Sequence, residues 1–296
     1  MTLFERSSNY LKFFALKGWK RGAVIESQFR WFLYNLGRGL QTNKKQKKDL
    51  LVTLTTTPKR FAVVEKTLRS IVSQSYRPAT VRIFIEKQFE ESLTRQISHL
   101  SKFGIQVIGV EAGLGPHNKL VPQLRMGFEE AYLIYLDDDI IYPRHLFQTM
   151  IETSQRVNDS SVIANWGQLC TFDKNGDLVS YRKWPSWREA GTAPQACVPL
   201  GVAGVLLPQG LVKRKFQELG DLSSLCPYQD DLINFATIVK NDLKVVMNFK
   251  KQRIPITWPH SQDENLWKSN VNQGENDKCV KKLLTIFPEI RRKLVR

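Results

Sequence analysis

Between residues 50 and 136 the chain alternates short, strongly apolar runs with longer stretches in which apolar side chains recur at helical spacing. The apolar runs have the length of strands, and the longer stretches have the length of helices. Strands are predicted at 50–55, 80–85, 105–110 and 132–136, and helices at 60–74, 90–103 and 119–130. Strand–helix alternation with short connections forms a mostly parallel sheet with helices on both faces, so we predict a Rossmann-like α/β fold.

Polar side chains follow three of these predicted strands at the point where each strand ends. Thr55, Thr56 and Arg60 come at or just after the end of the first strand, and Glu86 follows the second. The fourth strand runs into three consecutive aspartates at 137–139. In open α/β sheets ligands bind beyond the carboxyl ends of the strands, so these side chains are expected to line one crevice.

The run Asp137-Asp138-Asp139 is the strongest chemical signal in the chain. Three adjacent carboxylates after a fully apolar strand repel one another. A divalent cation relieves that repulsion, and Mg²⁺ and Mn²⁺ prefer carboxylates together with substrate phosphates. The pattern therefore indicates a metal site, and the alternative is a solvated turn or helix cap, where aspartate is also common.

An apolar strand that ends in Asp-x-Asp, here Asp137 to Asp139, resembles the DXD signature of GT-A glycosyltransferases. Segments 52–60, 70–75 and 115–120 resemble those of the family-2-like enzymes of bacterial polysaccharide biosynthesis. The resemblance covers roughly residues 50–265, and it implies a GT-A fold and a nucleotide-sugar donor, by analogy a UDP-sugar. It also implies a Mn²⁺ or Mg²⁺ cofactor and a saccharide or lipid-linked saccharide acceptor in cell-surface polysaccharide synthesis.

The same resemblance assigns roles to individual residues on the donor side. It implies that Asp137 faces the ribose of the donor, and that Asp139 reaches the metal that bridges the diphosphate. His260 would complete the metal shell, although a lone histidine is also a common structural residue. Lys119 would place a cation beside phosphate, unless it is an ordinary exposed lysine at a helix start. The donor-binding residues implied in this way are Thr55, Thr56, Arg60, Glu86, Lys119, Asp137 and Asp138.

Two features point to the acceptor side. The glycine-rich run at 200–208, which includes Gly204, allows a backbone to lie close to a ligand and resembles the acceptor-side segment of GT-A enzymes. A buried strand with a bulge is the alternative for this run. Trp258 either stacks on a sugar ring or packs in the core, and the sequence favours neither.

Asp230 and Asp231 open an apolar helical segment after the glycine-rich run. Their position resembles the acidic motif of inverting GT-A enzymes, with Asp231 as the catalytic base and Asp230 as its acidic neighbour. A sugar hydroxyl is a poor nucleophile, so a carboxylate must take its proton, and burial beside a second carboxylate raises the pKa of such a base. Two alternatives remain. The pair caps a helix, or the base is one position away, because this chain has Asp-Asp where the motif has Glu-Asp.

Basic residues gather at the two ends of the chain. Residues 1–48 hold eleven Lys or Arg against Glu5 and Glu26, a net charge of +9, and residues 280–296 carry +5, which leaves +2 of the total +16 for 49–279. The first segment interleaves aromatic side chains with Lys and Arg, which suits an amphipathic helix on an anionic membrane surface. A basic helix packed on the domain is the alternative. No apolar run approaches the roughly 20 residues that span a bilayer.

The predicted organisation has three parts: a basic helical segment at 1–48, a GT-A catalytic domain at 49–270 and a basic C-terminal helix or tail at 271–296. Within the domain, 49–142 is expected to bind the nucleotide-sugar and 143–270 the acceptor. The four widely spaced cysteines argue against a zinc site and against a dense disulfide framework. We therefore expect a cytoplasmic protein, bound peripherally at the inner face of the cytoplasmic membrane.

Other function classes fit parts of the sequence. A retaining glycosyltransferase or a nucleotidyltransferase would keep the fold, but a nucleotidyltransferase usually opens with a glycine-rich phosphate loop, and 55–60 contains no glycine. A nucleic-acid-binding protein should carry basic and aromatic residues on its central fold. The near-neutral charge of 49–279 argues against that class, so no nucleic-acid partner is expected.

Overall fold

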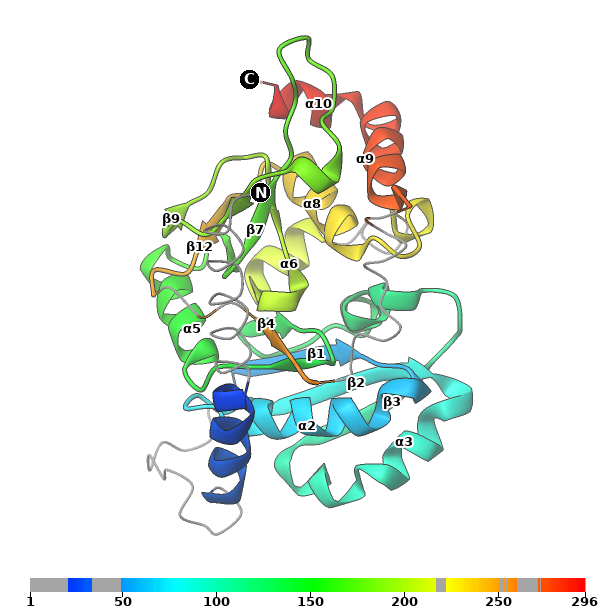
Figure 1. Cartoon of the computed structure of the whole chain (residues 1–296), viewed down its shortest axis with the longest axis vertical. Helices are drawn as coiled ribbons and strands as arrows, with labels where there is room; N and C mark the ends of the chain where they lie inside the picture. Colours follow the sequence, from blue (N-terminus) through cyan, green and yellow to red (C-terminus); the bar gives the residue numbers. More distant parts are fainter. Residues whose placement is uncertain are drawn as a thin grey trace, which may run out of the picture.

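The centre of the molecule is an eight-stranded mixed sheet, in the order β3-β2-β1-β4-β11-β6-β12-β9 (Figure 1). The computed structural model describes residues 21–33, 49–216, 222–250, 253, 255–259, 271 and 273–295. The strands of the sheet are β1 Leu50–Thr55, β2 Thr80–Glu86, β3 Ile105–Val110, β4 Tyr132–Tyr135, β6 Val162–Ala164, β9 Gly191–Thr192, β11 Val205–Pro208 and β12 Val245–Met247.

The half of the sheet formed by β3, β2, β1 and β4 is parallel throughout. Further along, β11 runs antiparallel to both β4 and β6, while β6 and β12 pair in parallel. Each of the four strands predicted from the sequence is present, with ends within one residue of the expected ones. The predicted α/β class with a mostly parallel sheet is confirmed.

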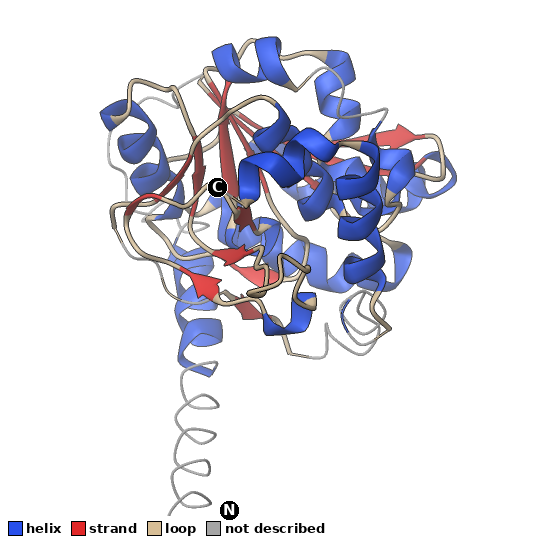
Figure 2. Ribbon diagram, turned by 90° about the horizontal axis from the view of Figure 1, so that it is seen from above, coloured by secondary structure: helices blue, strands red, loops and turns tan. Residues whose placement is uncertain are grey.

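Helices cover both faces of this sheet (Figure 2). One face carries α2 Phe61–Val72, α3 Glu90–Gln96 and α5 Leu146–Arg156, and the other carries α4 Val121–Met126, α6 Gln209–Lys215 and α8 Asp230–Lys240. Successive residues of a strand point to opposite faces. In β1, Leu50 and Val52 therefore pack into the apolar cluster under α2, while Leu51 packs into the cluster under α8. Burial on both faces explains why the predicted strands are almost continuously apolar.

Beyond α5 the chain forms short pieces of secondary structure joined by long loops. A three-stranded antiparallel sheet holds β7 Gly167–Leu169, β8 Ser186–Trp187 and β10 Cys197–Pro199, and β5 Ile140–Ile141 pairs with β13 Ile256–Thr257. The strand β5 directly follows the three aspartates. In addition, the Trp258 N–H donates to the Asp139 carbonyl at 2.9 Å. The late segment 255–259 is thereby fixed beside the aspartate loop.

Two C-terminal helices, α9 Glu275–Ile286 and α10 Pro288–Leu294, pack against α8. Lys293 of α10 donates to two carbonyls in the last turn of α8, at 3.0 and 3.1 Å, where the helix dipole favours a cation. A disulfide joins Cys226, just before α8, to Cys279 of α9. Cysteine spacing did not predict this bond, because the pairing of distant cysteines is set by the fold.

Residues 21–33 form a helix at the edge of the domain, drawn in dark blue in Figure 1. The predicted basic helical segment at 1–48 is described only over these residues. Within the described part of the chain, no helix combines the length and the apolar character needed to cross a membrane.

Candidate active site

The ends of β1 and β4 meet in a first group of charged side chains. Pro58 opens a short 3₁₀ turn after β1, and Arg60 at the end of that turn reaches the aspartate loop. Arg60 Nη1 donates to Asp138 Oδ1 at 2.6 Å, and Thr56 Oγ1 donates to Asp138 Oδ2 at 2.6 Å. Arg60 also lies 3.6 Å from Asp139 Oδ2. Thr56, Arg60, Asp138 and Asp139 are termed the strand-end group.

The carboxylate of Asp138 is buried, and both of its oxygens accept a hydrogen bond. Burial raises the pKa of Asp138, although Arg60 and Thr56 favour its charged form. For Arg60, burial works against the charge, but the carboxylates of Asp138 and Asp139 raise its pKa. Two donors thus hold Asp138 in one position. The side chain is therefore better suited to shaping a binding site than to transferring a proton.

A second group of charges is built around Lys119, which ends the 3₁₀ turn Gly115–Lys119. Lys119 Nζ lies 2.6 Å from Asp137 Oδ1, with which it makes a hydrogen bond. It lies 2.8 Å from Asp230 Oδ2, an ion pair without hydrogen-bond geometry. The Lys119 side chain is only 6% exposed, so it is not an ordinary surface lysine. Asp137, Lys119, Asp230 and Asp231 are termed the helix-start group, because two of the carboxylates open α8.

Lys119 remains charged in this position. Burial disfavours its ammonium form, but Asp137 and Asp230 outweigh that cost and raise the pKa of Lys119 well above its usual value. One buried cation therefore links the loop that follows β4 to the first residue of α8. This link brings the predicted donor side and the predicted catalytic aspartates into one cluster.

Asp231 has a raised proton affinity. Burial, together with the negative charge of Asp230, raises the pKa of Asp231 to about 8, against the opposing effect of Lys119. Asp231 Oδ1 accepts the backbone N–H of Gly201 at 2.9 Å. A Cβ on Gly201 would lie 2.9 Å from Lys119 Nζ and 3.2 Å from Asp231 Oδ1, so a larger residue would displace both. A carboxyl group with such a pKa can accept or release a proton near neutral pH, as general-base chemistry requires.

Gly201 and Tyr142 are site residues that sequence patterns did not identify. Tyr142 Oη accepts the N–H of Asp137 at 2.9 Å and donates to its carbonyl at 3.2 Å, so it fixes the backbone of the first aspartate. The glycine-rich run did mark the segment that holds Gly201, but it drew attention to Gly204. Nothing in the sequence signals the Tyr142 contact, because it joins a side chain to a backbone across a turn.

Two predicted donor residues make contacts away from the aspartates. Thr55 Oγ1 donates to the Phe84 carbonyl at 2.8 Å, which joins β1 to β2. Glu86 ends β2 as predicted and accepts a hydrogen bond from Gln88 at 3.1 Å. Both residues therefore lie at the carboxyl edge of the sheet, and their roles toward a donor stay predictions.

The predicted acceptor-side residues lie against the core. Gly204 has a φ of +83°, and a Cβ there would approach Leu136. Trp258 is buried, and its indole N–H donates to Thr67 Oγ1 at 3.1 Å, so packing is the role in which the structure places it. The predicted metal ligand His260 lies outside the described residues.

The aspartates do not form a closed metal site by themselves. Among the residues that the structure describes, no three His, Cys, Asp or Glu side chains gather closely enough to hold a metal. Asp137 is the most open of the three aspartates, with 29% of its side chain exposed, whereas Asp139 is buried. Mg²⁺ and Mn²⁺ commonly bind one or two carboxylates and complete their shell with substrate phosphates and water. The oxygen ligands present fit a cation that is shared with a phosphate-bearing ligand.

No family model and no curated protein matches the sequence. The structure is similar to a mannosyltransferase, PcManGT, of Pyrobaculum calidifontis in complex with GDP-Man and Mn²⁺. The TM-score is 0.51 at 14% identity, over 90% of this chain and 74% of that one. It is also similar to residues 1–349 of S. aureus TarS in complex with UDP, with a TM-score of 0.48 at 14% identity, over 70% and 59%. A third likeness is to GalNAc-T7 with UDP, GalNAc and Mn²⁺, with a TM-score of 0.46 at 12% identity, over 68% and 41%.

The first of these likenesses establishes the fold and nothing finer, because the identity is only 14%. The chain spans less than two thirds of the other two proteins. The prediction of a GT-A fold is confirmed by this likeness.

Proposed function

We propose that the protein is a metal-dependent glycosyltransferase that moves a sugar from a nucleotide-sugar to a saccharide or lipid-linked saccharide, with inversion at the anomeric carbon. The acceptor oxygen forms a bond to C1 as the bond between C1 and the donor diphosphate breaks. Asp231 takes the proton of the attacking hydroxyl. The nucleoside diphosphate leaves with the electron pair of the broken bond.

The observation that carries this proposal is the position and proton affinity of Asp231. A carboxylate that merely opens a helix is stabilised in its charged form by the helix dipole, which lowers its pKa. Burial and the charge of Asp230 instead raise the pKa of Asp231 to about 8. Lys119 pairs with Asp137 and with Asp230, the residue next to Asp231, so the Asp231 carboxyl group lies near the aspartate loop where the donor is expected. A proton acceptor next to a donor-binding edge is the arrangement that direct displacement at C1 needs.

On the donor side, Arg60 and Lys119 supply positive charge for the diphosphate, and Asp137 and Asp139 are the residues that would hold a Mn²⁺ or Mg²⁺ ion. When bound, the cation offsets the negative charge that develops on the leaving diphosphate. The fold neighbour from P. calidifontis was solved with GDP-Man and Mn²⁺, which supports a nucleotide-sugar donor without selecting the base. UDP is our default by analogy, and GDP is the first alternative.

We place this activity in cell-surface polysaccharide synthesis at the cytoplasmic face of a membrane. The net charge of +9 on residues 1–48 supports an anionic lipid surface as partner. The Cys226–Cys279 bond argues against a cytoplasmic location, because disulfides persist mainly in oxidising surroundings. Trapping free thiols in intact cells, followed by mass spectrometry of both cysteines, would show whether the bond exists where the enzyme works.

A screen of nucleotide-sugars tests the proposed activity. We expect one UDP- or GDP-linked donor to raise the melting temperature and to be hydrolysed slowly in the presence of Mn²⁺ or Mg²⁺. Excess chelator should abolish both effects. A protein that responds to no donor with either metal contradicts the proposal. Once an acceptor is found, a product with retained anomeric configuration would exclude Asp231 as the base of a direct displacement.

A further inference from the structure

The helix at 21–33 buries small and polar side chains and exposes large apolar ones, the reverse of an ordinary surface helix. Its side chains buried against the domain are Ala23, Ser27 and Arg30, and its large exposed side chains are Ile25, Phe29 and Phe32. With about 3.6 residues per turn, these two sets lie on opposite sides of the helix. A surface helix normally turns its apolar stripe toward the core. Here the small and polar side faces the core, and the side with Ile25, Phe29 and Phe32 faces away, while Val24 and Trp31 on the flank pack partly buried against the domain.

The exposed side is conspicuous in the described part of the chain. Ile25, Phe29 and Phe32 are 65%, 59% and 56% exposed, and they make up three of the eight large hydrophobic side chains exposed there. They are termed the apolar stripe. Apolar groups concentrated on one exposed helix face mark a contact surface more often than scattered single residues do.

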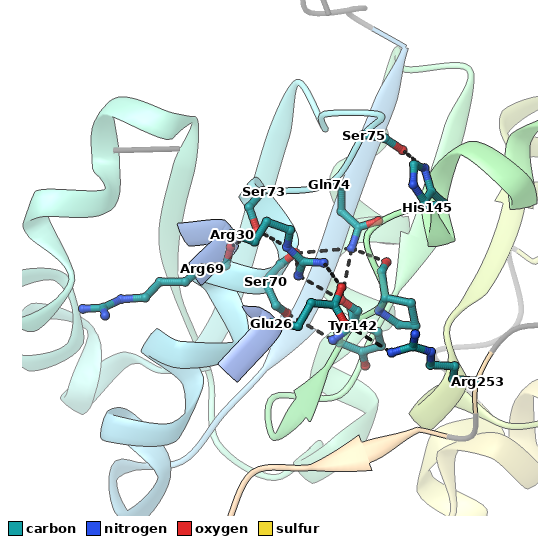
Figure 3. Close-up of polar contacts among 11 residues, drawn as sticks. Glu26, Arg30, Arg69, Ser70, Ser73, Gln74, Ser75, Tyr142, His145 and Arg253 are labelled. Atoms are coloured by element: carbon teal, nitrogen blue, oxygen red, sulfur yellow. Dashed lines mark hydrogen bonds and ion pairs between the residues drawn. The ribbon is translucent and has the colours of Figure 1, made fainter. Parts of the chain in front are cut away.

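Buried and exposed polar contacts attach the helix to the domain (Figure 3). Arg30 donates to Ser73 Oγ at 2.8 Å and to the Tyr142 carbonyl at 3.1 Å, and Glu26 pairs with Arg253 at 3.1 Å. Tyr142 in turn bonds to the backbone of the first aspartate. The helix is therefore fixed beside the aspartate loop, with the apolar stripe directed away from it.

The positive charge of residues 1–48 indicates an anionic partner for the apolar stripe. Residues 1–48 hold eleven Lys or Arg against two acidic residues. Helices that combine apolar side chains with nearby cations bind the interface of anionic bilayers, where both contributions add. A second copy of the chain is a poor occupant, because each copy carries a net charge of +16 and the two would repel.

We infer that the apolar stripe docks on an anionic lipid bilayer, with Ile25, Phe29 and Phe32 entering the headgroup region and the helix lying along the surface. The purpose of the docking, access to a lipid-linked acceptor, rests on the proposed function. The docking itself does not depend on glycosyl transfer. Because Arg30 ties the helix to the chain beside the aspartates, docking holds the crevice at a fixed distance from the bilayer.

Cosedimentation of the full chain with vesicles tests the inference. The stripe variant is Ile25→Ser/Phe29→Ser/Phe32→Ser, and the matched control is Met126→Ser/Phe249→Ser/Ile286→Ser, three exposed hydrophobic residues elsewhere. Both variants keep every charge. On phosphatidylcholine–phosphatidylglycerol vesicles at moderate salt, the stripe variant should lose about tenfold or more in partition coefficient, because each lost apolar group removes insertion energy. The control should bind like the wild type.

Each alternative occupant gives a different result. Equal binding of the stripe variant and the control overturns the inference. So does self-association of the wild type that the stripe variant abolishes, which would assign the stripe to a second copy. A dye on Phe29→Cys should shift its emission when anionic vesicles are added, and the other free cysteines, Cys170 and Cys197, are buried. No shift would mean that another part of the chain covers the stripe, again overturning the inference. Absence of donor turnover together with intact vesicle binding would count against the proposed function alone.

Discussion

The two charge groups at the crevice both contain adjacent aspartates, but their carboxylates are neutralised in different ways. In the strand-end group, Asp138 receives one donor on each oxygen, from Arg60 and Thr56. In the helix-start group, the single cation of Lys119 is shared between Asp137 and Asp230. Asp231 is left with the Gly201 N–H and with a like charge beside it.

This difference predicts a structural role for Asp138 and a reactive role for Asp231. A carboxylate with a donor on both oxygens is held in place and contributes shape and charge. A buried carboxyl group beside a second acid has a raised pKa and can exchange a proton. Two pairs of aspartates that look alike in sequence therefore suit different tasks. Substitutions in the two groups test that contrast.

Asp231→Asn should have the largest effect. It keeps the shape of the side chain but removes the proton acceptor, so kcat should fall by about 10²–10⁴-fold, the usual contribution of a general base. Donor Kd, measured by calorimetry, should change little.

The matched control for that variant is Asp230→Asn, which should cost about tenfold or less if Asp230 only tunes its neighbour. A large loss at Asp230 with sparing of Asp231 would move the base by one position. Equal, mild effects at both would favour helix capping as the role of the pair.

Lys119→Met should destabilise the protein by about 3–5 kcal/mol, because it leaves two carboxylates without their buried counter-ion. Urea unfolding measures the change. Adding Asp230→Asn to the variant should restore part of the stability, since one of the uncompensated charges is then gone. No recovery in the double variant would mean that Lys119 contributes packing instead of charge.

Arg60→Met should cost less, about 1–3 kcal/mol, because Asp138 keeps the hydroxyl of Thr56 and Arg60 itself is partly exposed. The same variant should weaken donor binding if Arg60 contacts the diphosphate. The companion variant Thr56→Val removes the donor to the other oxygen of Asp138. If Arg60→Met destabilises as strongly as Lys119→Met, the contrast between shared and separate donors is wrong.

The last prediction concerns pH. The pKa of Asp231 is raised from 3.8 to about 8, so the stability that its protonated form contributes is present at low pH and is lost as pH rises through about 8. Between about pH 4 and pH 8 the free energy of unfolding of the wild type should therefore fall relative to Asp231→Asn. Turnover should rise toward pH 8, because the base works deprotonated. Unfolding curves and a kcat profile that lack these opposite slopes would contradict the assignment.

The sequence predicted the parallel half of the sheet well because each of its strands can be recognised from its own residues. Burial on both faces makes β1 almost continuously apolar, and Pro58 marks where it stops. The sequence also predicted that Arg60 and the aspartates lie at one edge of the sheet, because the carboxyl ends of parallel strands share an edge.

The remainder of the site depends on contacts between distant segments, which periodicity does not record. The burial of Lys119 follows from the return of α8 to the aspartate loop, and the contact of Gly201 with Asp231 follows from the same approach. The Cys226–Cys279 bond and the inverted helix at 21–33 are likewise properties of the assembled fold.

The order of the strands also sets the order in which the crevice can be assembled. The pairing of β1, β2, β3 and β4 needs no later residue, and the strand-end group lies between β1 and the loop that directly follows β4. Proteins of this size fold in stages as the chain leaves the ribosome. Pulsed hydrogen exchange should therefore find β1 protected earlier than β12. If the proposed function holds, the proton acceptor joins the donor edge only when α8 packs against Lys119.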